Sequence, residues 1–600
     1  MNRGLLALAL LLSVFGGWWA YRAYRAPDPE KVYVFKGFEG PSHVSRVVRP
    51  PAATVPQFDI GGDHRLAVLV TDPTSGWLGF VRGFRARGVP FMLTEDPAVA
   101  LRHRVVLVYP RISGRLPPAT LQALAAHVRS GGTLLAFDQQ GGGLEDMFGA
   151  GDGIASRARR TLTWATPRGD PRETTLSINA SGEDNMDTIG FLAGKAEVLA
   201  AYDDGVPAVT CRRVVGRACL MGVDIAALAE RGMNGRGEAI SRDYVNGYEP
   251  SVDILFAWIR DLYVQGETMP WLISPAPSGR DVSIILTHDI DFTRSVVNAK
   301  AYADLLRANG LSGTFFMQTK YVKDWNDDIF FNARTVPLLR GLLAEGMELG
   351  SHSVAHSRVF KAFPLGDGRE AYPDYRPFVI DQTHARGGTV LGELRVSRFL
   401  LRKATGADVV SFRPGHLSYP PALPQALAAT GYLYSSALPA ESTLGYFPFQ
   451  TTYDRADAAL EPEYQFPVAI EDEQAPPLQD RFDAADALIA DIAREHGVAV
   501  ILIHPDVVQP KLGFEARLIA AWRGRAWMGS LRDFGAWWAA RDALDVDVAQ
   551  QGGKWVLSAR AGDKAVREVD VILPKGGAHG AARTMTLNLA PGQATTQVLN

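Results

Sequence analysis

The stretch Asp281-Val-Ser-Ile-Ile-Leu-Thr-His-Asp-Ile-Asp291 decides the fold. Its apolar, β-branched first half predicts a buried strand, and its polar end places Thr287, His288, Asp289 and Asp291 where that strand stops. In α/β folds, functional side chains gather at the carboxyl ends of strands. Two carboxylates one residue apart repel each other and lose hydration there, unless a cation or a proton-transfer role holds them. We therefore expect the reactive end of an α/β domain at this position.

Two histidines further along the chain suit such a cation. The segment Ser351-His-Ser-Val-Ala-His356 spaces His352 and His356 four residues apart. On a helical turn this spacing puts both imidazoles on one face, an arrangement that grips a divalent metal. An isolated pair of this kind is more often solvated or buried in a core. The ordered segments around it favour the metal site here.

Two more segments end in polar side chains. Val409–Tyr419 predicts a short strand that stops at Arg413 and a glycine loop, and Val498–Pro505 predicts an apolar strand with His504 at its tip. Three predicted strands thus carry reactive groups at the same end.

In this order, the segments resemble the NodB-homology polysaccharide deacetylases, also called carbohydrate esterase family four. The resemblance covers roughly 282–538 and implies a distorted (β/α) barrel that removes N-acetyl groups from a polysaccharide with the help of a metal. The segments that carry it are Thr287–Asp291, Gly313–Phe316, His352–His356, Arg413–Pro414, Gly431–Ser436 and Leu502–His504.

One feature departs from the family pattern. The family's two acids are usually adjacent, whereas Ile290 separates Asp289 from Asp291 here. A His-Asp-x-Asp motif is similar to the subgroup that includes the deacetylase part of the Pel exopolysaccharide modification protein. The resemblance implies that Asp289 is the general base and Asp291 the third metal ligand. The inserted residue leaves an exchange of these roles open.

The resemblance also implies roles for the remaining groups. His504 would protonate the leaving amine, and Arg413 would pair with Asp289 and keep it ionised and oriented. Asp291, His352 and His356 would hold the metal. Zinc suits two imidazoles and a carboxylate best, and nickel or cobalt also fit.

Several polar and aromatic residues remain candidates for substrate contacts or for support behind the ligands. A backbone N–H near Tyr419 would share the oxyanion with the metal. His288 and His416 are placed behind the ligands. Asp472, in Glu471-Asp-Glu473, would tune His504 or bind a cationic product, with a solvated charge run as the alternative. The candidates for stacking on sugar faces are Trp325, Tyr372, Tyr375 and Tyr446, although burial explains most aromatic residues.

Composition gives few further constraints on function. The 62 basic and 65 acidic residues leave a net charge of −3, so nothing indicates a polybasic surface for nucleic acid or acidic lipid. A chain of 600 residues is too long for one core and predicts several domains.

The amino terminus predicts a membrane anchor in 1–26. The run Gly4–Tyr21 is uncharged and apolar, and tryptophans, tyrosines and arginines follow it. A cleaved signal peptide is the alternative. The Pro-rich segment 27–62 is expected to be a linker that lifts the rest off the membrane. This predicts a protein on the extracytoplasmic, periplasmic face of the inner membrane, or a secreted one.

Residues 63–250 alternate strands and helices, which predicts a mostly parallel sheet of Rossmann or flavodoxin type. This part resembles a class I glutamine amidotransferase. It has no cysteine in its first half to act as nucleophile, so we interpret it as non-catalytic. Cys211 and Cys219 would form a cross-strand disulfide if a hairpin turn lies between them, and buried free thiols are the alternative.

The remaining boundaries follow from pattern changes. We expect a connector over 251–280, the deacetylase-like domain over 281–541, and a β-sandwich over 542–600, where the period of hydrophobic residues becomes two. The domain order is similar to part of the Pel modification protein, which implies an N-acetylgalactosamine-rich polysaccharide as substrate and export proteins as partners. The alternatives are a peptidoglycan deacetylase, another metal-dependent amidase, and a polysaccharide-binding protein without turnover.

Overall fold

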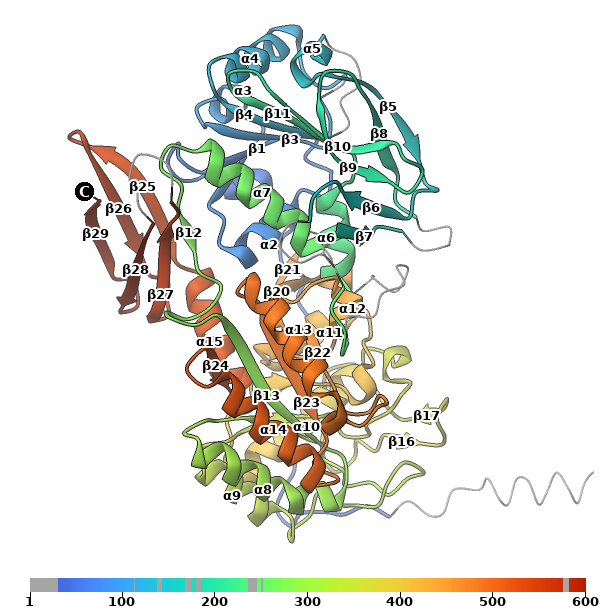
Figure 1. The fold of residues 1–600 in the computed structure, drawn as a ribbon. Coiled ribbons are helices and arrows are strands. Elements are labelled where there is room, and N and C mark those ends of the chain that lie inside the picture. Colours follow the sequence, from blue (N-terminus) through green and yellow to red (C-terminus); the bar gives the residue numbers. More distant parts are fainter. Residues whose placement is uncertain are drawn as a thin grey trace, which may run out of the picture.

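The computed structural model describes residues 31–112, 114–137, 143–167, 174–179, 185–235, 245–249, 252–456, 458–575 and 582–599. The expected anchor in 1–26 lies outside these residues. Among the helices that are described, none combines the length and the hydropathy that a bilayer crossing needs. Figure 1 shows an N-terminal α/β unit at the top, a larger α/β unit below it, and a small β unit at the left.

The N-terminal unit is built on a mixed sheet with the order β2-β1-β3-β4-β11-β10-β9-β6-β7. Its first five strands are parallel, and the others are antiparallel. Apolar strands such as β1, buried at every position, sit between helices as a parallel sheet requires. The Rossmann-like relationship stays a prediction. The elements are β1 (Leu66–Val70), α2 (Leu78–Arg87), β2 (Phe91–Thr94), α3 (Pro97–Ala100), β3 (Val105–Tyr109), α4 (Pro118–Arg129), β4 (Thr133–Phe137), α5 (Glu145–Phe148), β5 (Ala150–Ser156), β6 (Thr161–Trp164), β7 (Thr175–Ser177), β8 (Thr188–Ala193), β9 (Glu197–Tyr202), β10 (Pro207–Arg213), β11 (Arg217–Met221), α6 (Ile225–Met233) and α7 (Val252–Gly266).

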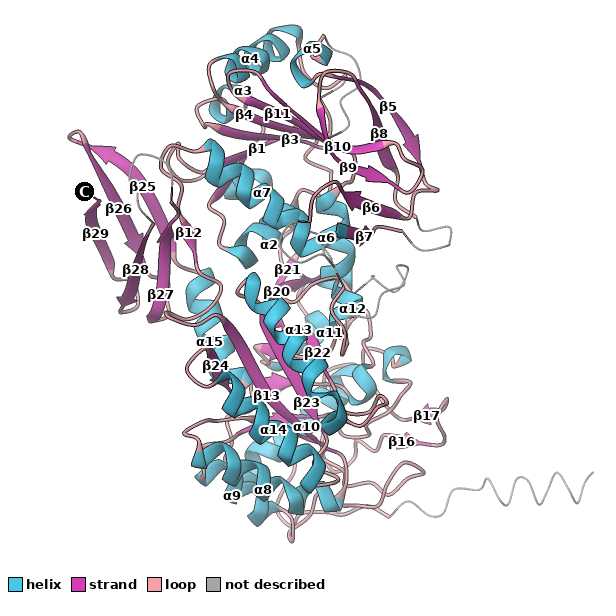
Figure 2. Cartoon of the chain, in the orientation of Figure 1, coloured by secondary structure: helices cyan, strands magenta, loops and turns pink. Residues whose placement is uncertain are grey.

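The larger unit is a curled, half-barrel sheet with the order β20-β21-β19-β18-β15-β14-β13-β23-β22, and β24 also pairs with β13. The stretch that opens the sequence forms β13, and all nine of its residues are buried. Helices cover the outside of this sheet (Figure 2). The main elements are β13 (Val282–Ile290), α8 (Thr293–Ala308), β14 (Thr314–Met317), α9 (Val336–Ala344), β15 (Glu348–Ser351), β16 (Phe378–Val379), β17 (Ala385–Arg386), α10 (Val390–Thr405), β18 (Ser411–Phe412), α11 (Leu423–Thr430), β19 (Tyr434–Ser435), α12 (Ala440–Thr443), β20 (Phe449–Thr452), β21 (Leu460–Gln465), β22 (Val468–Ile470), α13 (Phe482–Arg494), β23 (Val498–Ile503), α14 (Gln509–Trp522), β24 (Ala526–Gly529) and α15 (Leu531–Asp542).

The C-terminal β unit has two three-stranded sheets, with the orders β12-β27-β28 and β25-β26-β29. One apolar cluster, which includes Trp271, Val548 and Leu557, lies between them. The short strand β12 belongs to the expected connector, so that part of the connector completes this unit. The elements are β12 (Leu272–Ile273), β25 (Asp545–Gln551), β26 (Lys554–Arg560), β27 (Val566–Leu573), β28 (Arg583–Leu589) and β29 (Ala594–Leu599).

The segment expected as a free linker, 27–62, differs from that expectation over its described residues. Val32 forms a bridge with Val322, and the Phe35 N–H donates to the Tyr372 hydroxyl at 2.6 Å. Further along, Val55 and Phe58 are buried. Phe58 contacts the rings of Trp77 and Phe91 in the N-terminal unit. The apolar side chains spaced among the prolines therefore hold the described part of this segment against both units, and it is not a free spacer.

The N-terminal and larger units share one continuous core. The side chain of Arg87 in α2 packs over Phe256 of α7 and Phe447 of the larger unit, each at 4.7 Å from the ring centroid. Arg87 also pairs with the buried Asp253. This contact buries both charge and apolar surface, so the N-terminal unit packs firmly against the larger unit.

Candidate metal centre

The reactive side chains lie at the carboxyl ends of neighbouring parallel strands. Asp289 lies near the end of β13, His352 follows β15, Arg413 follows β18, and His504 follows β23. The sheet order puts these strand ends side by side, and the pairing of β15 with β18 and of β13 with β23 keeps them level. Segments more than two hundred residues apart in the sequence therefore meet at one place.

Asp291, His352 and His356 form a buried cluster, in which one ligand atom of each lies within 4.8 Å of the others. The Nε2 atoms of His352 and His356 are 3.3 and 3.5 Å from Asp291 Oδ1. His352 Nδ1 donates to the Arg413 carbonyl at 2.8 Å. That bond leaves Nε2 as the nitrogen that carries the free lone pair.

The chemistry of this cluster fits a divalent cation. Asp291 Oδ1 is buried and accepts no hydrogen bond in the described structure, which is costly for a carboxylate oxygen. Burial lowers the pKa of His356 well below its ordinary value, so that its imidazole is neutral. Two imidazoles and a carboxylate that face one point are a donor set that suits a divalent metal ion.

Asp289 lies beside this cluster, with Oδ2 at 3.7 Å from His352 Nε2. Arg413 Nη1 donates to Asp289 Oδ1 at 2.8 Å and to Thr287 Oγ1 at 2.9 Å. Its Nη2 donates to Ser436 Oγ at 2.8 Å, and its guanidinium lies over the Phe316 ring. Arg413 is fully buried, so it fixes Asp289 and compensates its charge.

His504 also lies next to the cluster, with Nε2 at 3.4 Å from Asp291 Oδ2. Its Nδ1 donates to Asp472 Oδ1 at 2.6 Å, and its backbone N–H donates to Asp472 Oδ2. Lys511 Nζ pairs with the same carboxylate at 2.6 Å. Burial lowers the pKa of His504, but the hydrogen bond to Asp472 and the charges of Asp291 and Asp472 outweigh it and raise this pKa to about 10. His504 is thus held protonated, as a proton donor must be.

The loop from His352 to His356 differs from the expected helical turn. It follows β15 as a loop in which Ser353 and His356 have φ angles of 64° and 52°. The carboxylate of Glu393, in α10, accepts the backbone N–H groups of Val354 and Ala355 at 2.7 and 2.9 Å. These bonds stabilise a loop whose positive φ angles are strained for non-glycine residues and are incompatible with a helical turn.

A cleft of about 1060 Å³ surrounds the site. Its wall includes Asp289, Asp291, His352, His356, His416, Tyr419, Asp472 and His504, together with Gly235 and Val245 of the N-terminal unit. Arg455 ties these walls together. Its Nε donates to the Asn234 carbonyl at 2.6 Å, its Nη1 donates to the Tyr419 carbonyl at 3.2 Å, and its guanidinium lies over the Tyr419 ring.

The structure does not bring His288 into this cleft. Its side chain points to the other face of β13, stacks on Phe315 with 4.5 Å between centroids, and lies 3.2 Å from Glu515. Residues alternate between faces along a strand, so a neighbour of Asp289 must face the core. His416 lines the cleft and lies 4.5 Å from the His356 ring. Burial lowers the pKa of His416 to about 4.

We expect the variant Asp472→Asn to lower kcat about 10- to 100-fold, because a supporting carboxylate that orients a functional imidazole has effects of that size. The amount of metal bound should be unchanged, since the Asp472 carboxylate bonds to His504 and Lys511 and not to the three candidate ligands. Glu473→Gln is the matched control, because this neighbouring side chain lines the cleft and is exposed. Steady-state kinetics with metal analysis of both variants checks the prediction, and equal rates for the two would contradict it.

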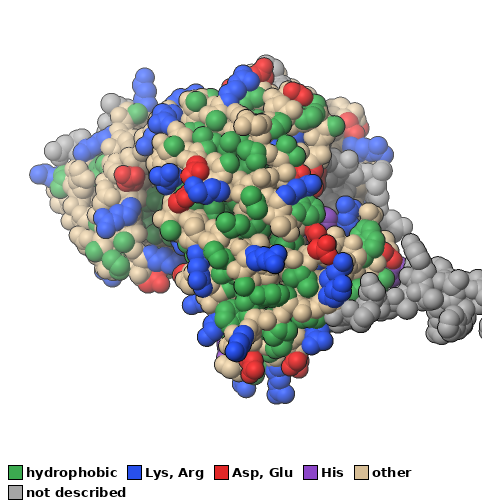
Figure 3. Space-filling view, turned by 90° about the horizontal axis from the view of Figure 1, so that it is seen from below, with side chains coloured by type: hydrophobic (Ala, Val, Ile, Leu, Met, Phe, Trp, Pro, Cys, Tyr) green, Lys and Arg blue, Asp and Glu red, His purple; other side chains and the backbone are tan. Residues whose placement is uncertain are grey.

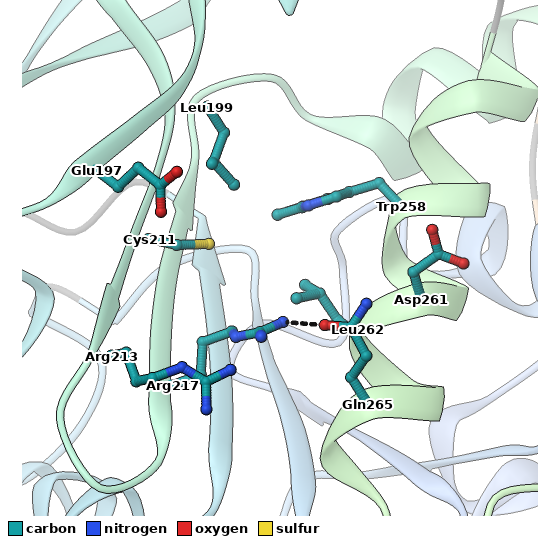
Figure 4. A pocket seen from close by; sticks show the side chains of 9 residues that line it. All are labelled: Glu197, Leu199, Cys211, Arg213, Arg217, Trp258, Asp261, Leu262 and Gln265. Carbon is teal, nitrogen blue, oxygen red and sulfur yellow. Dashed lines mark hydrogen bonds between the residues drawn. The ribbon is translucent and has the colours of Figure 1, made fainter. Parts of the chain in front are cut away.

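Cys211 and Cys219 are joined by a disulfide between the paired strands β10 and β11. Beside Cys211, a cavity of about 310 Å³ lies between this hairpin and α7, and Arg217 donates to Gln265 across it at 2.7 Å (Figure 4). Trp258 and Leu262 on the helix side of this cavity are almost completely buried. The disulfide lies in the N-terminal unit and contributes no group to the cleft.

Acids, imidazoles and an arginine around a cleft, at the strand ends of a half-barrel, are the parts of a hydrolase domain. Residues 277–435 match the family model described as polysaccharide deacetylase. No curated protein matches the chain.

Three solved structures illustrate the similarity. A polysaccharide deacetylase from Mycobacterium smegmatis shares 15% identity, with 43% of this chain and 92% of that chain covered and a TM-score of 0.33. A family 4 carbohydrate esterase from Streptomyces lividans, in complex with acetate, shares 19%, with 42% and 91% covered and a TM-score of 0.24. A CE4 domain of a xylanase from the hindgut metagenome of Trinervitermes trinervoides shares 14%, with 42% and 88% covered and a TM-score of 0.25.

Proposed function

We propose that the protein is a metal-dependent N-deacetylase that acts on an N-acetylhexosamine polymer. The observation that carries the proposal is the convergence of Asp291, His352 and His356 on one point, with Asp289 and His504 next to them. The polysaccharide deacetylase match over 277–435 supports the class of substrate.

The residues divide the reaction between them. Hydrolysis adds water to the acetyl carbonyl carbon, breaks the C–N bond, and releases acetate and a free amine. Asp289 accepts the proton of the attacking water, and Arg413 holds this carboxylate in place. His504, kept protonated by Asp472, gives its proton to the departing nitrogen. Asp291, His352 and His356 would hold a divalent cation, with zinc as our first choice, which would supply Lewis-acid activation of the water and the carbonyl oxygen.

The finer assignments follow from the resemblance. We propose that the His-Asp-x-Asp motif marks a relative of the Pel-type deacetylases and that the polymer is an N-acetylgalactosamine-rich exopolysaccharide outside the cytoplasm. The apolar run Gly4–Tyr21 supports an N-terminal anchor. On the face seen in Figure 3, basic, acidic and hydrophobic side chains are mixed, which suits a polymer without strong charge better than nucleic acid.

Acetate release tests the proposal. Purified protein is depleted of metal, reloaded with zinc, nickel or cobalt, and incubated with N-acetylgalactosamine oligomers, N-acetylglucosamine oligomers, peptidoglycan and a peptide. We expect acetate from an N-acetylated glycan only after reloading. Cleavage of the peptide without acetate release would replace the proposal with a peptidase. Glycan binding without release of acetate under any metal would favour a binding protein.

A further inference from the structure

One exposed aromatic side chain, Trp325, lies in a loop whose next two residues, Asn326 and Asp327, line the cleft around the candidate metal centre. Among the described phenylalanine, tyrosine and tryptophan residues, only Phe292 and Trp325 fall in the exposed class, at 37% and 55%. Phe292 lines the cleft, but the Arg294 guanidinium covers its ring at 5.1 Å. Trp325 has no ring contact and no indole hydrogen bond within the described part of the chain. Its indole therefore offers an uncovered apolar ring face to a ligand.

The loop that carries Trp325 is rigid. Asp324 Oδ1 pairs with Lys320 Nζ at 2.5 Å, and both side chains are almost completely buried. The same oxygen accepts the Asn326 N–H at 2.9 Å, while Asp324 Oδ2 accepts the Val379 N–H at 3.1 Å. The Trp325 N–H donates to the Val379 carbonyl at 3.1 Å. Bonds to Asp324 and Val379 thus hold the backbone on both sides of Trp325, so the indole is attached to an ordered loop.

The same loop touches the metal ligands. Asn326 Nδ2 donates to the His356 carbonyl at 3.2 Å, and both Asn326 and Asp327 line the cleft. Trp325 is therefore one residue away from a side chain that supports a candidate ligand.

We infer that Trp325 is a stacking platform for a pyranose ring that lies next to the sugar undergoing deacetylation. This inference rests on the proposed function for its substrate, an N-acetylhexosamine oligomer. The apolar C–H face of a pyranose packs on an indole, while its hydroxyls stay in water at the rim. The other aromatic residues named as stacking candidates, Tyr372, Tyr375 and Tyr446, are buried and unavailable for this role.

The platform is tested by the pair Trp325→Ala and Trp325→Phe, with Leu338→Ala as an exposed control on the far helix α9. With N-acetylhexosamine tetramers we expect Trp325→Ala to raise KM about tenfold, corresponding to roughly 1.4 kcal/mol, and to leave kcat within about twofold. Trp325→Phe should recover most of the affinity because it retains a ring face. On a small aryl acetate, which cannot reach the platform, all three variants should match the parent protein.

A binding measurement keeps this test independent of turnover. The full chain is labelled with fluorotryptophan, and its Trp325 fluorine resonance is identified by its absence in Trp325→Phe. We expect a tetramer to shift that resonance in both metal-loaded and metal-free protein. If the tetramer shifts the resonance of metal-loaded protein but that protein releases no acetate, the platform is sustained and the deacetylase proposal is refuted. An unchanged resonance and an unchanged KM alongside normal acetate release would overturn the platform alone. A response to phospholipid vesicles but not to the tetramer would also overturn it and would identify a membrane contact.

Discussion

Asp289→Asn should lower kcat for acetate release about 1000-fold while the protein still binds one divalent metal ion. The loss follows because the amide cannot accept a proton from water, and a positioned general base contributes about 100- to 10,000-fold. Metal is retained because the three candidate ligands, Asp291, His352 and His356, are untouched. Single-turnover kinetics and metal analysis of the same preparation measure both quantities.

Asp291→Asn is the matched variant, since it replaces one carboxylate oxygen by an amide nitrogen in the other acid of the same motif. We expect it to lose metal, because its Oδ1 is the buried oxygen that both imidazoles face. If Asp289→Asn loses the metal and Asp291→Asn keeps it, the roles of the two acids are exchanged.

Arg413→Met should lower the free energy of unfolding by about 3–5 kcal/mol, the cost of leaving a buried charge without its partner. Arg413 is fully buried and donates to Asp289, Thr287 and Ser436. Methionine fills the volume over Phe316 but makes none of these bonds. Urea titrations of metal-free protein measure the change without a contribution from metal binding.

A double-mutant cycle separates the ion pair from the lost packing. In the Asp289→Asn background the carboxylate charge is absent, so Arg413→Met should cost at least about 1–2 kcal/mol less than in the parent protein. An equal cost in both backgrounds would show that Arg413 stabilises the fold without compensating Asp289.

Strand ends were the predictable part of the site. An apolar run followed by polar residues predicts where a buried strand stops, and parallel strands in one sheet end at the same edge. That logic brings Asp289, Arg413 and His504 together before any coordinates are known. His352 was expected on a helical turn, and only the spacing to His356 and the family resemblance connected it to them. The period-two pattern after Leu544 likewise matches strands β25 to β29.

Groups that support the site from other elements were harder to predict. Glu393 lies in α10, a helix whose sequence shows only an amphipathic pattern, and nothing local connects it to the loop at Val354. Lys511 and Arg455 also act through contacts that depend on tertiary packing. His288 was predicted to support the metal ligands because it is next to Asp289 in the sequence. Successive residues of a strand point to opposite faces of the sheet, so its side chain points away from the cleft. His352 and His356 lie in a loop in which Ser353 and His356 adopt left-handed backbone conformations. This loop brings the two imidazoles together, as a helical turn would.

The segment between Lys31 and Gly62 illustrates another limit. Prolines and a low density of regular pattern predict a linker, yet Phe35, Val55 and Phe58 are enough to anchor it on two units. A few scattered apolar residues give no periodic signal, so burial of this kind is visible only when the partner surface is known.

Metal stoichiometry is the most direct test of the whole account. Protein stripped by a chelator is titrated with zinc by calorimetry, in parallel with His352→Ala. We expect one tight site per chain in the parent protein and none of comparable affinity in the variant. A folded parent protein that binds no divalent metal, or a His352→Ala variant that binds it equally well, would contradict the central claim that Asp291, His352 and His356 form a metal centre.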